Sequence, residues 1–504
     1  MHGRILLIGS IVAALPLASA QAQAGDKPAP TFGETVEVRV VNVETVVVDA
    51  ANQPVHGLTK ADFRLLVDGK EVPIDHFDEV LEASAATAPP AAATPGVPTP
   101  PTEVARALLV LVDDSFAVQA PRNAALQSLG RELSTLGAAD QAAVVAFDGR
   151  RLDTLASWTS DRRVLADALA AAAKRPALGS RFIAEDRGMG EDVDLTIEAA
   201  LEAGLDPDEL GMVTAPLYKR VNPAARTQLR RTTDAMAGAL RGFETPPGRK
   251  VLVLLTGGWS TRVAPQLFGP LVESANRLGY TLYAVDVATN EPAATKALDA
   301  LARATGGRDA SGLGRKLLAT ISRDAGSYYW LGFDADFRGN DSVHKVEVQV
   351  LRPGLRVRSR SSYSDVSGRT ETSMRAEGVS LFGGAPEDKR LIVIVEGTKD
   401  LARKKHEVEL AVTLGVPVEA LSFSPAPEGG FLAEVPLAIL ALDKDGGRSE
   451  IASRLRVALS GAPPTQGLAR FRTTVKLRRV DQRVVFTVEA ADGRFLWGDT
   501  ELKF

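Results

Sequence analysis

The residues best placed to do chemistry follow an apolar run about a fifth of the way along the chain. After Ala107–Val112 the sequence continues as Asp113, Asp114 and Ser115, and a second apolar run ends at Asp148. Runs of this kind are typical of buried parallel strands, whose C-terminal ends deliver polar groups to one edge of a sheet. Carboxylates and hydroxyls are hard oxygen ligands, so weakly bound Mg²⁺ or Mn²⁺ is one hypothesis for this edge. The alternative is that these residues only cap strand and helix ends.

The same sequence gives little support to catalysis. Asp113 and Asp114 are adjacent on a strand and therefore point in different directions, which places them poorly to flank one bond. No Gly-x-Ser-x-Gly elbow, His-Glu-x-x-His helix or glycine-lysine phosphate loop occurs. The chain has no cysteine, which excludes disulfides, thiolate metal sites and cysteine nucleophiles. Apart from His2, the histidines are scattered among expected strands and turns, so we predict no catalytic residue and no enzyme: His56, His76, His344 and His406.

Strand and helix patterns alternate around these acids, over residues 105–335. Helical patterns at 161–173 and 227–243 precede an apolar strand run at 250–256. A helical pattern at 264–278 then precedes a second strand run at 280–287, and a last helix is expected at 293–304. Repeated units of this kind predict a doubly wound, Rossmann-like domain with a mainly parallel sheet. Residues 178–224 interrupt the rhythm, and we expect a helical insertion on the rim there.

The flanking segments have the alternating pattern of β-strands. Residues 25–82 predict a small β-rich module, with a hairpin at Asp68-Gly69 and one helical turn near 58–62. A Pro/Ala-rich linker at 83–104 follows. Residues 336–388 are expected to form a β extension and connector. Seven short strands between 389 and 504 predict an antiparallel β-sandwich. The fold class is therefore multidomain α/β plus β.

Residues 1–24 have the pattern of a secretory signal peptide, with Arg4 before an apolar stretch and small residues at 18–24. We expect cleavage after Ala24, export to the periplasm or the extracellular space, and no integral membrane span in the mature chain. Retention of the segment as an anchor is the alternative. The net charge is −4, with 59 basic and 63 acidic side chains, and no basic run is interleaved with aromatics, so nucleic-acid binding is not favoured.

The ordered segments ALLVLVDDSFAV, QAAVVAFDG, GRKVLVLLTGGWS, TLYAVDV and ATGG resemble the landmarks of a von Willebrand factor A (VWA) domain. With the flanking NVETVVVDAANQPVHGLTKADF and SYYWLGF, the chain resembles a bacterial subgroup of exported proteins that carry a VWA-related domain. The resemblance implies a protein partner, recognised through a metal-ion-dependent adhesion site of the form Asp-x-Ser-x-Ser.

Measured against that family pattern, the metal site of this chain is incomplete. Asp113 and Ser115 match, Ala117 stands where the second hydroxyl is expected, and Gly257 stands where the family has an acid. Thr214 is the best match for the family's ligand threonine. The resemblance therefore implies a degenerate metal site of Asp113, Ser115 and Thr214, next to a ligand-binding rim of six residues: Asp114, Phe116, Asp148, Gly257, Gly258 and Trp259.

Three functions follow from these expectations. The first is recognition or adhesion outside the cytoplasm, through the rim of the α/β domain. The second is a structural or assembly scaffold of the cell envelope without metal dependence. The third is an enzyme with an unrecognised site. A recognition rim should carry an exposed apolar or charged cluster at the strand ends, whereas a scaffold should spread its interfaces over the β modules.

Overall fold

A computed structural model provides the structure of the chain. It describes residues 39–81, 105–181, 223–243, 245–257, 259, 267–288, 292–382, 386–400, 406–426, 429–443, 447–490 and 494–504. The expected signal peptide, the expected linker, most of the expected insertion, Thr214 and Gly258 lie outside these residues. The described chain divides into two compact units, one built on residues 40–367 and the other on the segment from Gly368 to the C-terminus. It is a multidomain protein of mixed α/β and β structure.

The α/β domain of the first unit contains a six-stranded sheet in the order β10-β9-β8-β5-β6-β7. All neighbouring pairs are parallel except β6 and β7, which are antiparallel. The chain moves from β5 outward to β7 and then returns to β8 on the other side of β5. The order in which the chain adds strands therefore reverses between β5 and β8, although the two strands are parallel. The strands are β5 (Arg106–Asp113), β6 (Gln141–Phe147), β7 (Leu152–Thr159), β8 (Arg249–Thr256), β9 (Tyr280–Asp286) and β10 (Arg308–Asp309).

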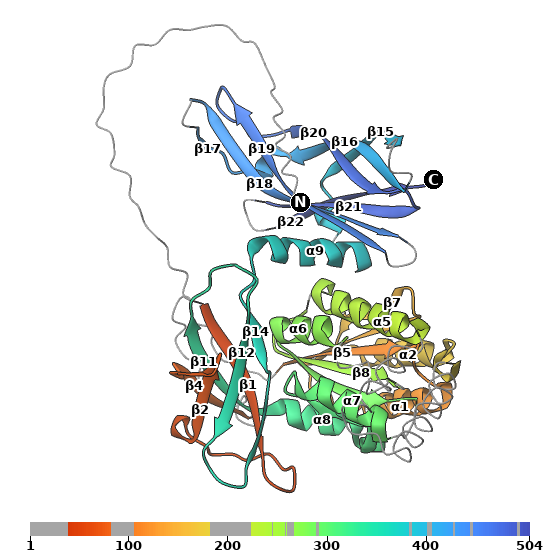
Figure 1. Ribbon diagram of the computed structural model, residues 1–504, viewed down its shortest axis with the longest axis vertical. Helices are drawn as coiled ribbons and strands as arrows, with labels where there is room; N and C mark the ends of the chain where they lie inside the picture. Colours follow the sequence, from red (N-terminus) through yellow and green to blue (C-terminus); the bar gives the residue numbers. More distant parts are fainter. Residues whose placement is uncertain are drawn as a thin grey trace, which may run out of the picture. The chain divides into compact units, whose positions relative to one another are not determined.

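Helices cover both faces of this sheet, which explains why every residue of β5 is buried. One face packs against α1, α2 and α8 through a core that includes Leu126, Leu169 and Ile321. Figure 1 shows α5 and α6 side by side over the other face, in agreement with their packing contacts. The helices are α1 (Gln119–Arg131), α2 (Arg162–Lys174), α5 (Pro223–Gly242), α6 (Gly269–Leu278), α7 (Pro292–Arg303) and α8 (Leu317–Gly326), with 3₁₀ turns η2 (Leu133–Thr135) and η4 (Ser311–Lys316).

A β-sandwich completes the first unit, and it is assembled from two distant parts of the sequence. Its sheets have the orders β13-β1-β11-β4 and β14-β12-β2-β3. They enclose one apolar core that includes Val43, Leu65, Tyr329 and Val346. The elements are β1 (Arg39–Val48), η1 (Lys60–Asp62), β2 (Phe63–Val67), β3 (Lys70–Val72), β4 (His76–Leu81), β11 (Ser327–Ala335), β12 (Val343–Val350), β13 (Arg356–Ser359) and β14 (Ser362–Ser364).

This sandwich differs from the domain boundaries that the sequence suggests. Residues 327–335 pair with β4 rather than with the α/β sheet, and 343–350 pair with β2. The predicted boundary at 335/336 therefore falls inside one sandwich, and the α/β domain is inserted between β4 and β11. The physical reason is burial, because neither β1–β4 nor β11–β14 has enough apolar surface on its own to close a two-layer core.

The second unit is an antiparallel sandwich, with sheets β15-β16-β20 and β17-β18-β21-β22, and β19 paired to β18. The seven strands predicted from 389 onward are present, though longer than expected, and α9 packs on β18 and β21 of the same unit. The elements are α9 (Gly368–Phe382), η5 (Pro386–Asp388), β15 (Ile392–Asp400), β16 (Glu407–Pro417), η6 (Val418–Ala420), β17 (Ser424–Pro425), β18 (Phe431–Asp443), β19 (Arg448–Leu459), β20 (Leu468–Arg478), β21 (Gln482–Glu489) and β22 (Phe495–Leu502).

Several local predictions are confirmed. The hairpin turn has Asp68 and Gly69 at positive φ, as a tight two-residue turn requires, and Thr59 with Asp62 forms a capping box around η1. Strand β7 was not anticipated, because polar residues interrupt its apolar pattern and only Ala156 is buried. Among the described residues, no helix is long and apolar enough to cross a membrane.

Candidate functional site

The candidate site lies at the point in the α/β sheet where the order of strand addition reverses, between β5 and β8. In open α/β sheets, ligands bind in the crevice at the C-terminal ends of the two strands that flank such a reversal. Here those strands are β5, which ends at Asp113, and β8, which ends at Thr256. The predicted acids therefore occupy the position at which this class of fold places a binding site.

Protein donors occupy the carboxylate of Asp113, which is fully buried. Thr256 Oγ1 donates to Oδ2 at 2.6 Å, and this bond joins the ends of the adjacent strands β5 and β8. The hydroxyl and the backbone N–H of Ser115 both donate to Oδ1. Ser115 Oγ also lies 3.2 Å from Thr232 Oγ1 of α5, which covers the loop. Burial raises the pKa of Asp113 to about 6, against the opposing effect of its hydrogen-bond donors.

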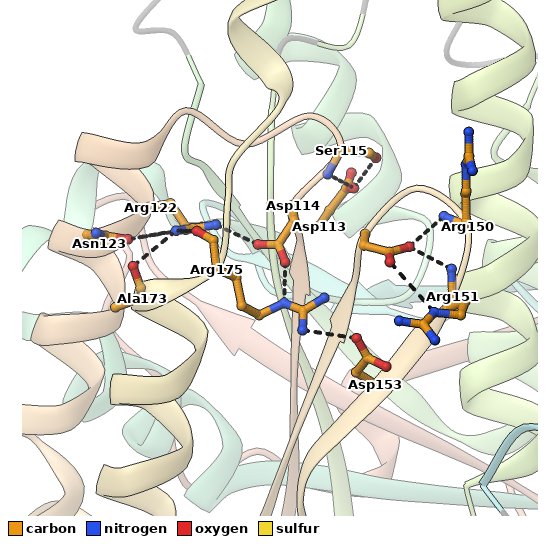
Figure 2. A network of polar contacts seen from close by, with 11 residues as sticks. Asp113, Asp114, Ser115, Arg122, Asn123, Arg150, Arg151, Asp153, Ala173 and Arg175 are labelled. Carbon is orange, nitrogen blue, oxygen red and sulfur yellow. Dashed lines mark hydrogen bonds and ion pairs between the residues drawn. The ribbon is translucent and has the colours of Figure 1, made fainter.

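Asp114 points away from Asp113 and into a different environment (Figure 2). Its Oδ1 accepts from Arg122 Nη1 at 2.6 Å and its Oδ2 from Arg175 Nε at 2.6 Å. Arg175 continues to Asp153 of β7, with 2.9 Å between Nη1 and Oδ2. Arg122 is fully buried and Asp114 is 1% exposed. Two guanidinium groups therefore compensate this carboxylate from inside the protein.

Two residues of the predicted ligand-binding rim, Asp148 and Gly257, add no free ligand to these acids. Asp148 caps a turn, since its Oδ1 accepts from the backbone N–H groups of Arg150 and Arg151 at 2.8 and 2.7 Å. A Cβ at Gly257 would lie 2.2 Å from Asp286 Oδ1, so no side chain fits at that position. Among the described residues, no group of three His, Cys, Asp or Glu side chains has the geometry of a metal site.

The predicted ligand-binding rim is largely closed to solvent. Trp259 is 1% exposed and Phe116 is 2% exposed, and the two rings meet edge to face at 6.4 Å. Asp114 is equally buried. The expectation that these three residues face a partner differs from the structure, because the aromatic side chains instead complete the core under the strand-end loops.

The segment that follows α2 covers the acidic loop and supplies the exposed surface beside it. Leu178 N donates to the Asp114 carbonyl at 2.8 Å, and Gly179 N donates to the Ala117 carbonyl at 3.0 Å. Gly179 must be glycine, since a Cβ there would lie 2.1 Å from the Phe116 carbonyl oxygen. The Leu178 side chain is 50% exposed on this segment.

One cluster outside this site contains the residue types of a hydrolase triad. Ser327 Oγ lies 3.4 Å from His56 Nδ1, and Glu79 Oε1 lies 3.1 Å from the same nitrogen. A proton relay needs the serine and the carboxylate on opposite ring nitrogens. Here both lie at Nδ1, so the arrangement differs from a catalytic triad. Glu79 also accepts from Tyr329 and from the backbone of Gly57, as expected of a carboxylate that ties a loop to the sandwich.

The aromatic run at 328–330 is buried on both faces of β11, with Tyr328, Tyr329 and Trp330 each under 8% exposed. An alternating strand with two buried aromatics is the sequence-based expectation, and the structure buries all three. Sequence reasoning missed the arginine partners of Asp114. A signal for one of them exists: Arg122 shares the spacing of Leu126 and Leu129 on the buried face of α1. A charge in an apolar helical stripe indicates an internal ion pair.

Comparisons with known proteins add little to this geometry. No protein-family model and no curated protein matches the chain. Among solved structures, the pilus adhesin SpaC from Lactobacillus rhamnosus GG is similar over 79% of this chain and 56% of its own, at 9% identity and a TM-score of 0.24. The chain thus covers little more than half of that adhesin, and so low a TM-score supports no inference about fold or function. What the structure itself defines is a multidomain α/β plus β protein.

Proposed function

We propose that this chain is an exported, non-enzymatic recognition protein whose VWA-like α/β domain docks another protein without a divalent cation. The observation that carries the proposal is the hydrogen bond between Asp113 and Thr256, which joins the C-terminal ends of the adjacent strands β5 and β8. A metal-dependent adhesion site needs carboxylate and hydroxyl oxygens free for the ion. In this chain the two acids are engaged by protein donors instead.

The VWA-like character of the domain is part of the same proposal. Three features support it: the order of strand addition reverses between β5 and β8, Asp113–Ala117 lies at the end of β5, and helices cover both faces of the sheet. A loop held by so many internal bonds is pre-organised, and pre-organisation favours binding because less conformational entropy is lost. Leu178 gives this rigid edge an exposed apolar contact.

A scaffold is the second candidate, and a specific observation favours it. Edge strand β15 exposes Ile392, Ile394 and Val395, each at 39% or more. Exposed apolar edge strands are sites of pairing with other chains. Interfaces on the β modules are what a scaffold requires.

Site-specific photo-cross-linking in the native host separates the two functions. A photo-reactive residue replaces Leu178, Ile394 or the exposed control Arg303 in the full chain, with and without EDTA. Recognition by the α/β edge predicts a discrete protein adduct at position 178 that EDTA does not reduce. An adduct at 394 alone would favour the scaffold, and loss of the 178 adduct in EDTA would contradict metal independence.

A further inference from the structure

A second polar cluster, far from the Asp113 site in the sheet, lies where the α/β domain meets the β-sandwich of the same unit. Arg249 begins β8, at the opposite end of that strand from the predicted acids, and Arg308 begins β10, beside the middle of β9. Arg358 lies in β13, and Arg360 directly follows that strand. Four guanidinium groups from two layers thus gather at one domain boundary.

Two carboxylates form ion pairs with three of these four arginines. Asp324 Oδ2 lies 3.3 Å from Arg308 Nε and 3.0 Å from Arg358 Nη2. Glu44 Oε2 lies 3.4 Å from Arg249 Nε. Arg360 donates to the backbone carbonyls of Asn276 and Asn42, which carry no compensating charge. The cluster therefore has an excess of two positive charges.

The cluster is partly buried, since the side chains of Arg358 and Arg308 are 15% and 25% exposed, and part of its hydrogen-bonding capacity is unused. Arg249 is 2% exposed, and its guanidinium carbon lies 4.2 Å from the centre of the Tyr328 ring. Nη1 of Arg249 and Nη1 of Arg358 are shielded from solvent and have no acceptor among the described residues. Burying a charged donor without a partner is energetically unfavourable, so an acceptor at these nitrogens would stabilise the folded state.

The members of the cluster share one interior region. Tyr283 is fully buried, and its hydroxyl lies 3.5 Å from Asp324. Burial and the charge of Asp324 raise the pKa of Tyr283 to about 12, whereas Arg249, Arg358 and Arg308 all act against this rise. All three arginines are therefore within electrostatic reach of one hydroxyl, which is itself a hydrogen-bond donor.

We propose that this arginine cluster binds a compact dianionic oxyanion of the phosphate or sulfate type, which joins the α/β domain to the β-sandwich. A dianion matches the excess of two positive charges, and its oxygens suit the unpartnered guanidinium N–H groups. The anion accepts from Arg249 and Arg358 and is held between residues of both layers. Its binding stabilises the folded state of the unit, since the unfolded chain has no such site.

Calorimetry and thermal unfolding of the full chain test this site, with inorganic phosphate or sulfate as the probe and chloride at matched ionic strength as the control. The chain should bind either dianion saturably and unfold at a higher temperature in its presence. Arg358→Gln should weaken binding about tenfold, the effect of one charge-assisted bond. Glu44→Gln removes a negative charge and should tighten binding. Arg303→Gln, on an exposed arginine, should change nothing.

The opposite signs expected for Arg358→Gln and Glu44→Gln separate a built site from general charge effects. If Arg358→Gln does not fold, the wild type and Glu44→Gln still decide the question. Absence of saturable binding in the wild type overturns the proposal and would mean that water, not an anion, hydrates the arginine cluster. Binding that neither variant alters also overturns it, since that result indicates an adventitious ion only.

Discussion

The carboxylate of Asp114 lies 2.6 Å from the guanidinium of Arg122, and both side chains are closed to solvent. The first is at the end of β5 and the second in the first turn of α1, so the ion pair fixes the strand-to-helix turn that contains Ser115 and Phe116. The same turn would hold the ion in a metal-dependent site. Internal cations thus rigidify the loop that the family resemblance assigns to a metal.

Replacing Arg122 by methionine should destabilise the first unit by about 3–5 kcal/mol, because it removes one partner of a buried ion pair and leaves Asp114 undercompensated. Urea unfolding measures the change. The double variant Asp114→Asn/Arg122→Met should recover part of the loss, whereas Arg131→Met, at an exposed arginine of the same helix, should lie near the wild type. Equal losses in the single and the double variant would show that the pair is not coupled.

Thr256→Val tests the hydrogen bond that joins the end of β8 to Asp113. The substitution keeps the shape of the side chain and leaves Asp113 Oδ2 without its donor, at an expected cost of about 1–3 kcal/mol in the free energy of unfolding. Thr154→Val on β7 is the matched control, because Thr154 is exposed and should change stability by less than about 0.5 kcal/mol. A similar small effect at both positions would mean that the bond does not hold the site.

The raised pKa of Asp113 predicts a specific pH dependence of stability. The folded state binds a proton more tightly than the unfolded state, whose aspartates titrate near their ordinary value of 3.8. This contribution to stability is therefore complete below about pH 4 and is lost as the pH rises through about 6. Relative to Asp113→Asn, the wild type should gain stability between pH 7 and pH 5, as measured by denaturant unfolding. A difference that is flat over this window would contradict the shift.

Restoring a side chain at position 257 should not rebuild a metal site. A Cβ there would meet Asp286 Oδ1 at 2.2 Å, so Gly257→Ala should destabilise the domain by about 1–3 kcal/mol through overpacking. Gly269→Ala is the control, because nothing lies within 4 Å of a Cβ at that position. Thermal unfolding of the two variants compares them directly. Equal stability would show that the strand end can yield and that Asp286 does not fill the acid's place.

Much of the fold could be predicted from sequence because its signals are local. Apolar runs such as 107–112 mark buried strands, and Asp68-Gly69 fixes a hairpin through its backbone geometry. The shared sandwich could not be predicted in this way, because the pairing of β4 with β11 joins residues more than 240 positions apart. Alternation along each strand shows which face is buried but not which strand is its neighbour.

The sequence predicts where the candidate site lies, but not whether its carboxylate oxygens are free to bind a ligand. Asp113 and Asp114 do lie at the end of a central parallel strand, as the pattern of apolar residues indicated. Whether their oxygens are open depends on Thr256, Arg122 and Arg175, which reach them from three other elements. Only Arg122 left a trace in the sequence, through its place in the apolar stripe of its helix.

The most direct test of the account is calorimetric titration of Mg²⁺ and Mn²⁺ into the full chain, with Asp113→Asn measured in parallel. Because protein donors engage both carboxylates, we predict no saturable heat at millimolar ion and no difference between the two proteins. Saturable binding in the wild type that Asp113→Asn abolishes would contradict the account and would make the strand-end loop a working metal site.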